Sequence, residues 1–199
     1  MHEPNTRPLR SAIFPEGHSG DEGSLPESGR HLIGILPGEG VGPELIEVVR
    51  ELLGILEDQL NLKFDLRIGG LIGAEAERQT GTALPEEVEG FCEEVFADGG
   101  VLLCGPGGGR FVYDLRARFD LFCKFTPIKP LPVLQDTGPL RPSTVAGVDM
   151  VIVRENVSGL YFSEGNCDGE EAIHTFRNSR VAIERILRAA ISLAQQRRG

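Results

Sequence analysis

Hydrophobic residues follow two different spacings along the chain from residue 31 onward. Short apolar runs are typical of buried parallel strands, and a run that alternates with polar residues is typical of a half-buried strand. Apolar residues three and four positions apart predict helices between these strands. Strands are expected at 31–36, 63–68 and 100–104, with helices from Pro43 onward and over 85–96. This β-α-β-α-β order predicts an α/β fold with a mostly parallel sheet flanked by helices.

Two helices have an apolar stripe that we expect to be buried. Pro43 and Glu44 suit the start of the first, and Asn178 or Ser179 is expected to cap the last, at 180–198. The first stripe comprises Leu45, Val48, Val49, Leu52, Leu53 and Leu56, and the last comprises Val181, Ile183, Ile186, Leu187, Ala190, Ile191 and Ala194.

The remaining pattern divides the chain into three parts. Residues 1–30 alternate prolines and glycines without apolar periodicity, so a disordered tail without a secretory signal is expected there. Residues 31–104 form the first α/β portion. Residues 105–199 are less regular in their spacing and are expected to form a further part. That part has a predicted helix at 113–122, an extended proline-containing stretch and a strand at 148–153.

Composition excludes several classes of protein. The chain has 199 residues and a formal net charge of −10, which opposes sequence-independent nucleic-acid binding. No apolar run is long enough to predict a membrane span. Four scattered cysteines without C-x-x-C spacing favour structural thiols in a reducing, cytoplasmic compartment.

Two glycine-rich loops follow predicted strands. The first, from Gly38 to Gly42, departs from the dinucleotide fingerprint because its third glycine comes one residue early, and Glu39 places negative charge where phosphate would sit. It is interpreted either as a ligand loop or as a tight turn. The second, residues 105–110, fits a ligand loop or a connection between domains equally well.

Basic residues are the best candidates for binding chemistry. An arginine fork binds a carboxylate through two parallel hydrogen bonds, so converging arginines suit a di- or tricarboxylic acid. Arg154 is favoured because it is expected in a loop after the strand at 148–153, although each basic residue alone also fits a solvated surface. Tyr161 could donate a proton or simply pack. The basic set is Arg116, Arg118, Lys124, Lys129 and Arg154.

Four segments resemble one known family, the isocitrate/isopropylmalate (β-decarboxylating) dehydrogenases. Residues 35–44, ILPGEGVGPE, are similar to its G-D-G-I-G-P-E motif, and residues 115–122, LRARFDLF, to L-R-K-x-L-D-L-Y. Residues 149–161, DMVIVRENVSGLY, resemble D-x-V-I-V-R-E-N-x-x-G-x-Y, and the segment from Thr175 resembles the start of the helix that follows. Together they cover about the first half of a typical member, so the resemblance implies an incomplete fold in which residues 105–199 are part of a second, smaller domain.

The resemblance implies oxidative decarboxylation of a 2-hydroxy acid of the isocitrate or 3-isopropylmalate type, with NAD or NADP and Mg²⁺ or Mn²⁺. Arg116 and Arg154 would bind substrate carboxylate, and Tyr161 would help protonate the enolate. The family's second carboxylate arginine falls on Thr126, and the preceding asparagine on Lys124. Its catalytic lysine, metal-binding aspartates and main cofactor loop belong to its second half.

These departures leave alternatives open. The chain is expected to be inactive alone, and its expected partner is a second copy or a complementing C-terminal half. The resemblance implies that a homo-oligomer of equally short chains would not restore the missing lysine and aspartates. The alternatives are a non-catalytic carboxylate-binding or regulatory homologue of a full-length dehydrogenase, or a truncated product without a function of its own.

Overall fold

The structure, a computed structural model, describes residues 29–197, which divide into two units between Arg118 and Phe119. Residues 1–28, and with them the expected tail, lie outside the described part, whereas Arg30 already begins the first strand. The division falls later than the expected boundary after residue 104. The reason is that the glycine-rich loop and the helix after it pack on the first unit: Gly105 N donates to Leu36 O (2.8 Å).

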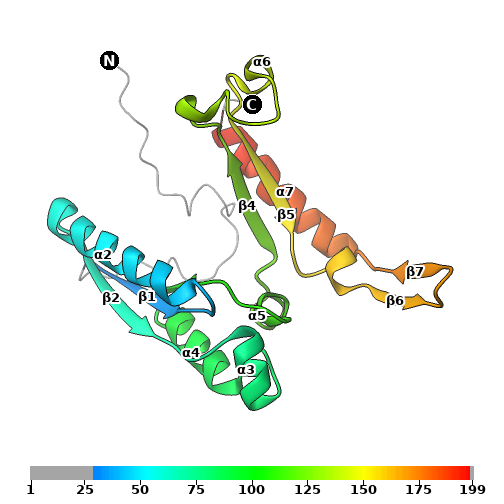
Figure 1. Ribbon diagram of the computed structural model, residues 1–199, viewed down its shortest axis with the longest axis horizontal. Helices are drawn as coiled ribbons and strands as arrows, with labels where there is room; N and C mark the ends of the chain where they lie inside the picture. The colour runs from blue at the N-terminus through cyan, green and yellow to red at the C-terminus, as the bar shows by residue number, and fades with distance from the viewer. Residues whose placement is uncertain (1–28, 198–199) are drawn as a thin grey trace. The chain divides into compact units, whose positions relative to one another are not determined.

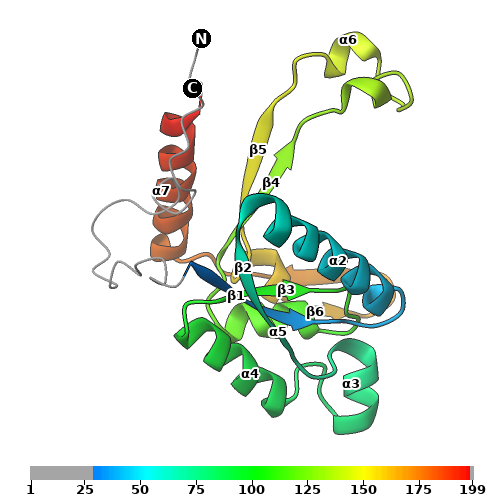
Figure 2. The ribbon, with the colours of Figure 1, turned by 90° about the vertical axis from the view of Figure 1, so that its left-hand side faces the viewer.

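The first unit is a three-stranded parallel sheet in the order β2-β1-β3, as the sequence pattern predicts. Ile33 at its centre aligns with Leu66 on one side and Val101 on the other. Figure 2 shows α2 on one face of the sheet and α4 on the other. The elements are β1 (Arg30–Leu36), α2 (Gly42–Leu60), β2 (Lys63–Ile68), α3 (Gly73–Thr80), α4 (Glu86–Ala97), β3 (Val101–Cys104) and α5 (Phe111–Arg118).

The core of this unit lies between α4 and the sheet. Val88, Cys92 and Val95 recur at helical spacing on α4 and are fully buried, as are Ile35 and Leu36 of β1. Burial raises the pKa of the Cys92 thiol to about 11, because a thiolate is poorly solvated there. Cys92 is therefore a structural thiol, as expected.

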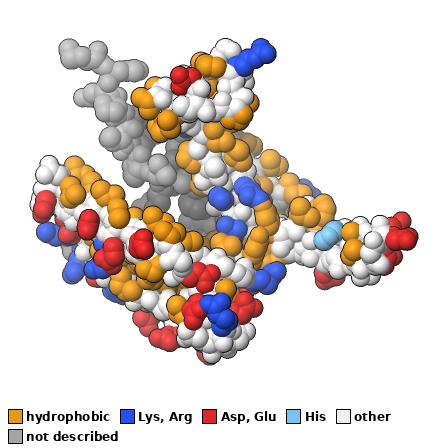
Figure 3. All heavy atoms as spheres, viewed as in Figure 1, with side chains coloured by type: hydrophobic (Ala, Val, Ile, Leu, Met, Phe, Trp, Pro, Cys, Tyr) orange, Lys and Arg blue, Asp and Glu red, His pale blue; other side chains and the backbone are white. Residues whose placement is uncertain are grey.

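The predicted buried stripe of α2 is wrong for most of its members. The helix is in contact with β2, but its buried residues are Gly42 and Ile46, while Leu45, Val48 and Leu52 are exposed. Apolar residues cover more of this helix than one sheet face can contact, so spacing alone did not select the packed side. Figure 3 shows hydrophobic side chains gathered along the visible side of α2.

The second unit contains two antiparallel strand pairs and one long helix (Figure 1). In β4–β5, Lys124 aligns with Arg154 and Thr126 with Ile152. The helix α7 packs against β5, and the exposed hairpin β6–β7 precedes it. The elements are β4 (Cys123–Ile128), η1 (Pro132–Leu134), α6 (Pro142–Val145), β5 (Met150–Glu155), η2 (Gly159–Phe162), β6 (Glu164–Cys167), β7 (Ala172–Thr175) and α7 (Arg180–Gln196).

The last helix begins as predicted but packs by another face. Ser179 caps it, since its Oγ accepts a hydrogen bond from Ala182 N (3.0 Å). The expected buried stripe is wrong at Val181, which is 72% exposed, and at Leu187, which is 53% exposed. Small residues, Ala182 and Ala189, form the buried face instead, because they let the helix backbone approach the strands closely.

Other boundaries also shift. The helix expected at 113–122 is α5 and ends at Arg118; soon after it, Asp120 has a positive φ of 46°, which a continuing α-helix does not allow. The strand expected at 148–153 is β5, which runs two residues further and includes Arg154.

Candidate carboxylate-binding site

Arg154 lies within β5, so the prediction that it lies in a loop after the strand is wrong. Its direct neighbour in the antiparallel register is Lys124 on β4, and both side chains are exposed. Directly opposite residues of an antiparallel pair lie on the same face, with Cα atoms about 4.5–5.5 Å apart. The register therefore places two cations side by side, and in Figure 3 Lys and Arg side chains gather over β4.

The two faces of the β4–β5 pair differ in what covers them. Glu155 contacts α7 through Arg185, so residues in phase with Glu155 face the helix. Side chains alternate along a strand, so Arg154 and Ile152 belong to the opposite face. Ile152 is exposed as well. We call this second face, with Lys124, Thr126, Ile152 and Arg154, the basic face.

The structure brings Arg154 and Tyr161 together. The guanidinium carbon of Arg154 lies 4.4 Å from the centre of the Tyr161 ring, within the range of a cation–π contact. Such stacking leaves the edge of the guanidinium plane, where its N–H donors point, open to a planar anion. Tyr161 itself lies in the short helix η2, which begins three residues after Asn156.

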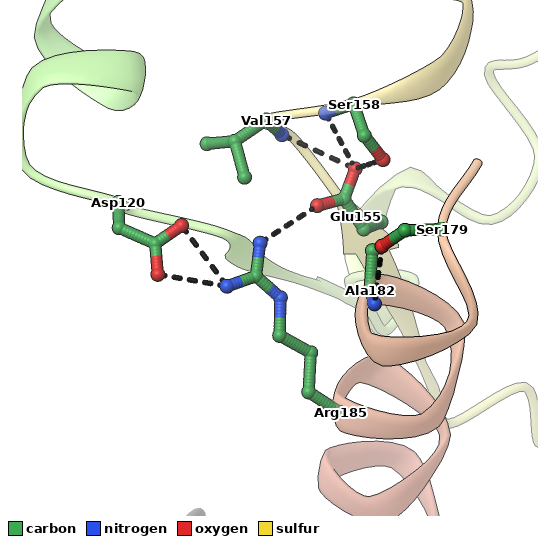
Figure 4. A network of polar contacts seen from close by, with 7 residues as sticks. All are labelled: Asp120, Glu155, Val157, Ser158, Ser179, Ala182 and Arg185. Atoms are coloured by element: carbon green, nitrogen blue, oxygen red, sulfur yellow. Dashed lines mark hydrogen bonds and ion pairs between the residues drawn. The ribbon is translucent and has the colours of Figure 1, made fainter. Parts of the chain in front are cut away.

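Glu155 fixes the turn that carries the chain from Arg154 toward Tyr161 (Figure 4). Its Oε2 accepts hydrogen bonds from Ser158 N (2.9 Å), Val157 N (3.2 Å) and Ser158 Oγ (2.7 Å). A carboxylate that accepts two backbone N–H groups restrains the turn to one shape. Glu155 thus positions its neighbour Arg154 without facing the same side.

Arg185 of α7 completes this support and was missed by the sequence reasoning. Its guanidinium donates to both carboxylate oxygens of Asp120 (3.0 and 2.7 Å) and to Glu155 Oε1 (3.4 Å), as Figure 4 shows. It also lies over the Phe122 ring, 4.3 Å from the centroid. Asp120 and Glu155, its two acidic partners, lie in the family-like segments 115–122 and 149–161. No sequence pattern indicates that a residue of α7 pairs with them.

The other residues of the predicted basic set differ in whether they form ion pairs. Arg118 forms ion pairs with Glu89 and Glu93 within the first unit, and Lys129 pairs with Asp149 (3.9 Å). These two cations are therefore engaged in salt bridges. Arg116 lies on α5 of the first unit, whereas Arg154 and Tyr161 lie in the second.

Among residues 29–197, neither Lys124 nor Arg154 forms an ion pair with a carboxylate. The two cations of the basic face thus differ from Arg118 and Lys129, each of which has an acidic partner. Like charges directly opposite each other destabilise an antiparallel pair. The register places these two cations opposite each other, and a bound anion would offset their repulsion.

The glycine-rich loops have a structural explanation in Glu39. Its carboxylate accepts hydrogen bonds from Glu75 N (3.0 Å), from Gly108 N and from Ala74 N (3.3 Å). The backbone donors at Glu75 and Gly108 hold the pKa of the Glu39 carboxyl below its usual value. The chain's own acid thus binds the N–H groups at the start of α3 and in the 105–110 loop, which supports the tight-turn interpretation.

The described residues do not fit a divalent ion. No group of three histidine, cysteine, aspartate or glutamate side chains within residues 29–197 could hold a metal. The N–H groups that a dinucleotide phosphate would use near Glu39 are already bound by that carboxylate. Within the same part of the chain, no helix is both long and apolar enough to cross a membrane.

Comparison with known proteins agrees with the motifs. Residues 32–199 match the sequence model of the isocitrate/isopropylmalate dehydrogenase family, so the chain belongs to this family. The 3-isopropylmalate dehydrogenase of Bacillus subtilis is 34% identical over 185 residues, covering 84% of this chain and 50% of that protein. The enzyme of the same name from Parasynechococcus marenigrum is 35% identical over 189 residues, covering 85% and 51%.

A solved structure supports the same fold. The TT0538 protein of Thermus thermophilus superposes with a TM-score of 0.62 at 28% identity, over 85% of this chain and 33% of that one. The chain spans about half the length of the curated relatives it matches. Family membership is therefore shown, whereas activity, substrate and cofactor are matters for proposal.

Proposed function

We propose that the basic face binds a carboxylate of a 2-hydroxy di- or tricarboxylic acid, and that the chain supplies the substrate-binding part of a β-decarboxylating dehydrogenase. The observation that carries this proposal is the Arg154 guanidinium. It is stacked on Tyr161 at 4.4 Å, exposed, and without an acidic partner in residues 29–197. Two relatives named 3-isopropylmalate dehydrogenase support the same substrate class.

The side chains of the second unit have separable roles in this proposal. Arg154 holds the carboxylate through two parallel N–H donors, which fixes both its position and its plane. Tyr161 supports the guanidinium with its ring, and its hydroxyl is the candidate for the proton delivered to the enolate carbon after decarboxylation. Glu155 and Arg185 keep the strand end and the turn in register. The family resemblance also makes Arg116 a candidate for binding a substrate carboxylate.

The family resemblance implies two further groups. NAD or NADP would accept the hydride, and Mg²⁺ or Mn²⁺ would polarise the substrate hydroxyl. The described residues offer no ligand set for the ion, and the loop at Glu39 does not fit a phosphate. We therefore propose that these residues bind substrate, and that turnover needs further groups from a complementing C-terminal half or a partner subunit.

The proposal is tested on the full chain by thermal shift with malate, tartrate, isocitrate and 3-isopropylmalate. A ligand that binds only the folded state stabilises it by about 2.7 kcal/mol at a concentration of 100 Kd. We expect at least one acid to raise the melting temperature and Arg154→Gln to abolish that rise. A rise that persists in Arg154→Gln contradicts the proposed site, and no rise with any acid contradicts the proposed function.

Activity is measured in parallel as nicotinamide reduction with Mg²⁺ or Mn²⁺ and the same acids. We expect negligible turnover from the chain alone. Turnover near that of ordinary dehydrogenases, about 1–10³ s⁻¹, contradicts the need for a second polypeptide.

A further inference from the structure

The basic face contains a second cation that the family resemblance does not assign. Where the resembling motif has an arginine, this chain has Thr126, and two residues earlier it has Lys124 in place of asparagine. Residues two apart on a strand lie on the same face. Thus the cation missing at Thr126 is replaced, on the same face of β4, by one at Lys124.

We propose that Lys124 is a substrate-binding residue and holds one carboxylate jointly with Arg154. This inference rests on the proposed function, because it takes a di- or tricarboxylic acid as the ligand. The geometry that supports it is the register: Lys124 is the residue directly opposite Arg154. Both side chains are exposed on the face that α7 does not cover.

The chemistry of the two groups is complementary. Stacking on Tyr161 restrains the Arg154 guanidinium, which offers a planar fork, whereas the Lys124 ammonium is a flexible point charge with three donors. A carboxylate bound to the arginine fork keeps lone pairs on both oxygens, and an adjacent ammonium donates to one of them. The anion would then neutralise two like charges that the register places together.

The contrast with Lys129 shows that this arrangement is specific to Lys124. Lys129 follows the end of the same strand but lies 3.9 Å from the Asp149 carboxylate, so its charge is already balanced. Both lysines are exposed, and replacing either by glutamine changes the net charge equally. Lys129→Gln is therefore the matched control.

The test is calorimetric titration of the full chain with 3-isopropylmalate and with malate at fixed ionic strength. Charge-assisted hydrogen bonds are the strong ones, so Lys124→Gln is expected to weaken binding about tenfold, Lys124→Arg to retain it within about threefold, and Lys129→Gln to leave it unchanged. The side-chain NMR signals of Lys124 should shift during the same titration.

The outcomes separate this inference from the proposed function. If Arg154→Gln weakens binding and Lys124→Gln does not, Lys124 is not a binding residue, while the proposed function stands. If the wild-type chain binds none of malate, tartrate, isocitrate and 3-isopropylmalate, both are overturned. If Lys124→Gln and Lys129→Gln weaken binding equally, the effect is one of net charge, and the inference is again overturned. Because Lys124 is exposed, unchanged circular dichroism of the variants is expected and verifies folding.

Discussion

Two regions of this chain present hydrogen-bond donors to an anion, and they differ in whether the chain already supplies one. In the first unit, three backbone N–H groups bind the Glu39 carboxylate. In the second, Lys124 and Arg154 face each other across β4–β5 with no ion-pair partner among residues 29–197. Both regions coincide with sequence motifs of the family, yet only the second has donors available for a ligand.

The difference shows that some residues of the family motifs stabilise the fold whereas others are available to bind a ligand. The Glu39 contacts join the β1–α2 loop to α3 and to the loop before α5, three segments far apart in sequence. Such long-range contacts restrain the unit as a whole. In the second unit, by contrast, Glu155 and Arg185 make the structural contacts, and they lie on the face of β5 opposite the basic face. Arg154 takes no part in these contacts and can therefore bind a ligand.

The largest expected effect is on ligand binding at Arg154. Arg154→Gln removes the charge and the fork and is expected to weaken dicarboxylate binding by about 10- to 100-fold. Arg154→Lys keeps the charge but loses the fork, so an intermediate affinity is expected. Calorimetric titration of the two variants measures both values. Equal affinities for wild type and Arg154→Lys would show that the planar fork is not used.

Arg185→Met tests whether the ion pairs of Arg185 with Asp120 and Glu155 stabilise the second unit. The Arg185 side chain is 28% exposed and that of Glu155 17%, so removal leaves two carboxylates without their cation. We expect the free energy of unfolding to fall by about 1–3 kcal/mol, measured by urea denaturation. The matched control is Arg180→Met on the same helix, whose side chain is 90% exposed and forms an ion pair with Glu184. A loss as large in the control would contradict a specific role for Arg185.

Thr126→Arg sharpens the comparison by adding a third cation to the basic face. Thr126 lies on the same face as Lys124, two residues further along β4. We expect dicarboxylate binding to tighten up to about tenfold, since one additional charge-assisted hydrogen bond becomes available. Titration in parallel with Thr137→Arg, an exposed position outside the strands, controls for added charge. Equal tightening in both variants would contradict a site-specific effect.

Lys124→Glu tests the repulsion between Lys124 and Arg154 directly. It replaces a like-charged cross-strand pair by an opposite-charged one, so the ligand-free chain is expected to gain about 0.2–1 kcal/mol in stability. The same change places a carboxylate beside Arg154 and is expected to abolish ligand binding. Denaturation without ligand and calorimetry with malate measure the two effects. A variant that is less stable than wild type contradicts a repulsion between these two side chains.

The smallest effect at neutral pH is expected at Glu39. Because backbone donors lower the pKa of its carboxyl below the ordinary 4.5, its contribution to stability is present above that value and is lost as pH falls through the lower folded-state pKa. Glu39→Gln does not titrate, so acid denaturation of the variant should lose this part of the pH dependence. Identical acid-unfolding curves for wild type and variant would contradict the role of the carboxylate.

Sequence patterns predicted the strands better than the helix faces. Apolar runs located β1 and β3, and an alternating run located β2, nearly to the residue, because each spacing is typical of extended chain. On α7 the apolar residues Val181, Ile183 and Leu187 suggested the packed side, but Ala182 and Ala189 occupy it. Spacing cannot distinguish two apolar faces of one helix when only one contacts the sheet.

The candidate site was predictable in its residues but not in its arrangement. Motif resemblance selected Arg154 and Tyr161, and the structure places them in contact. Pairing of Arg154 with Lys124 depends on the antiparallel register of β4 and β5, which are separated by more than twenty residues, and no local pattern specifies it. The same holds for Arg185, whose role comes only from the packing of α7.

The central claim is that the basic face is open to a carboxylate, whereas the donors around Glu39 are not. NMR chemical-shift mapping of the full chain during titration with 3-isopropylmalate tests it most directly. The account predicts shifts at Lys124, Arg154 and Tyr161 and none at Ala74, Glu75 or Gly108. Shifts confined to those last three amides, or no shifts at all, would contradict it.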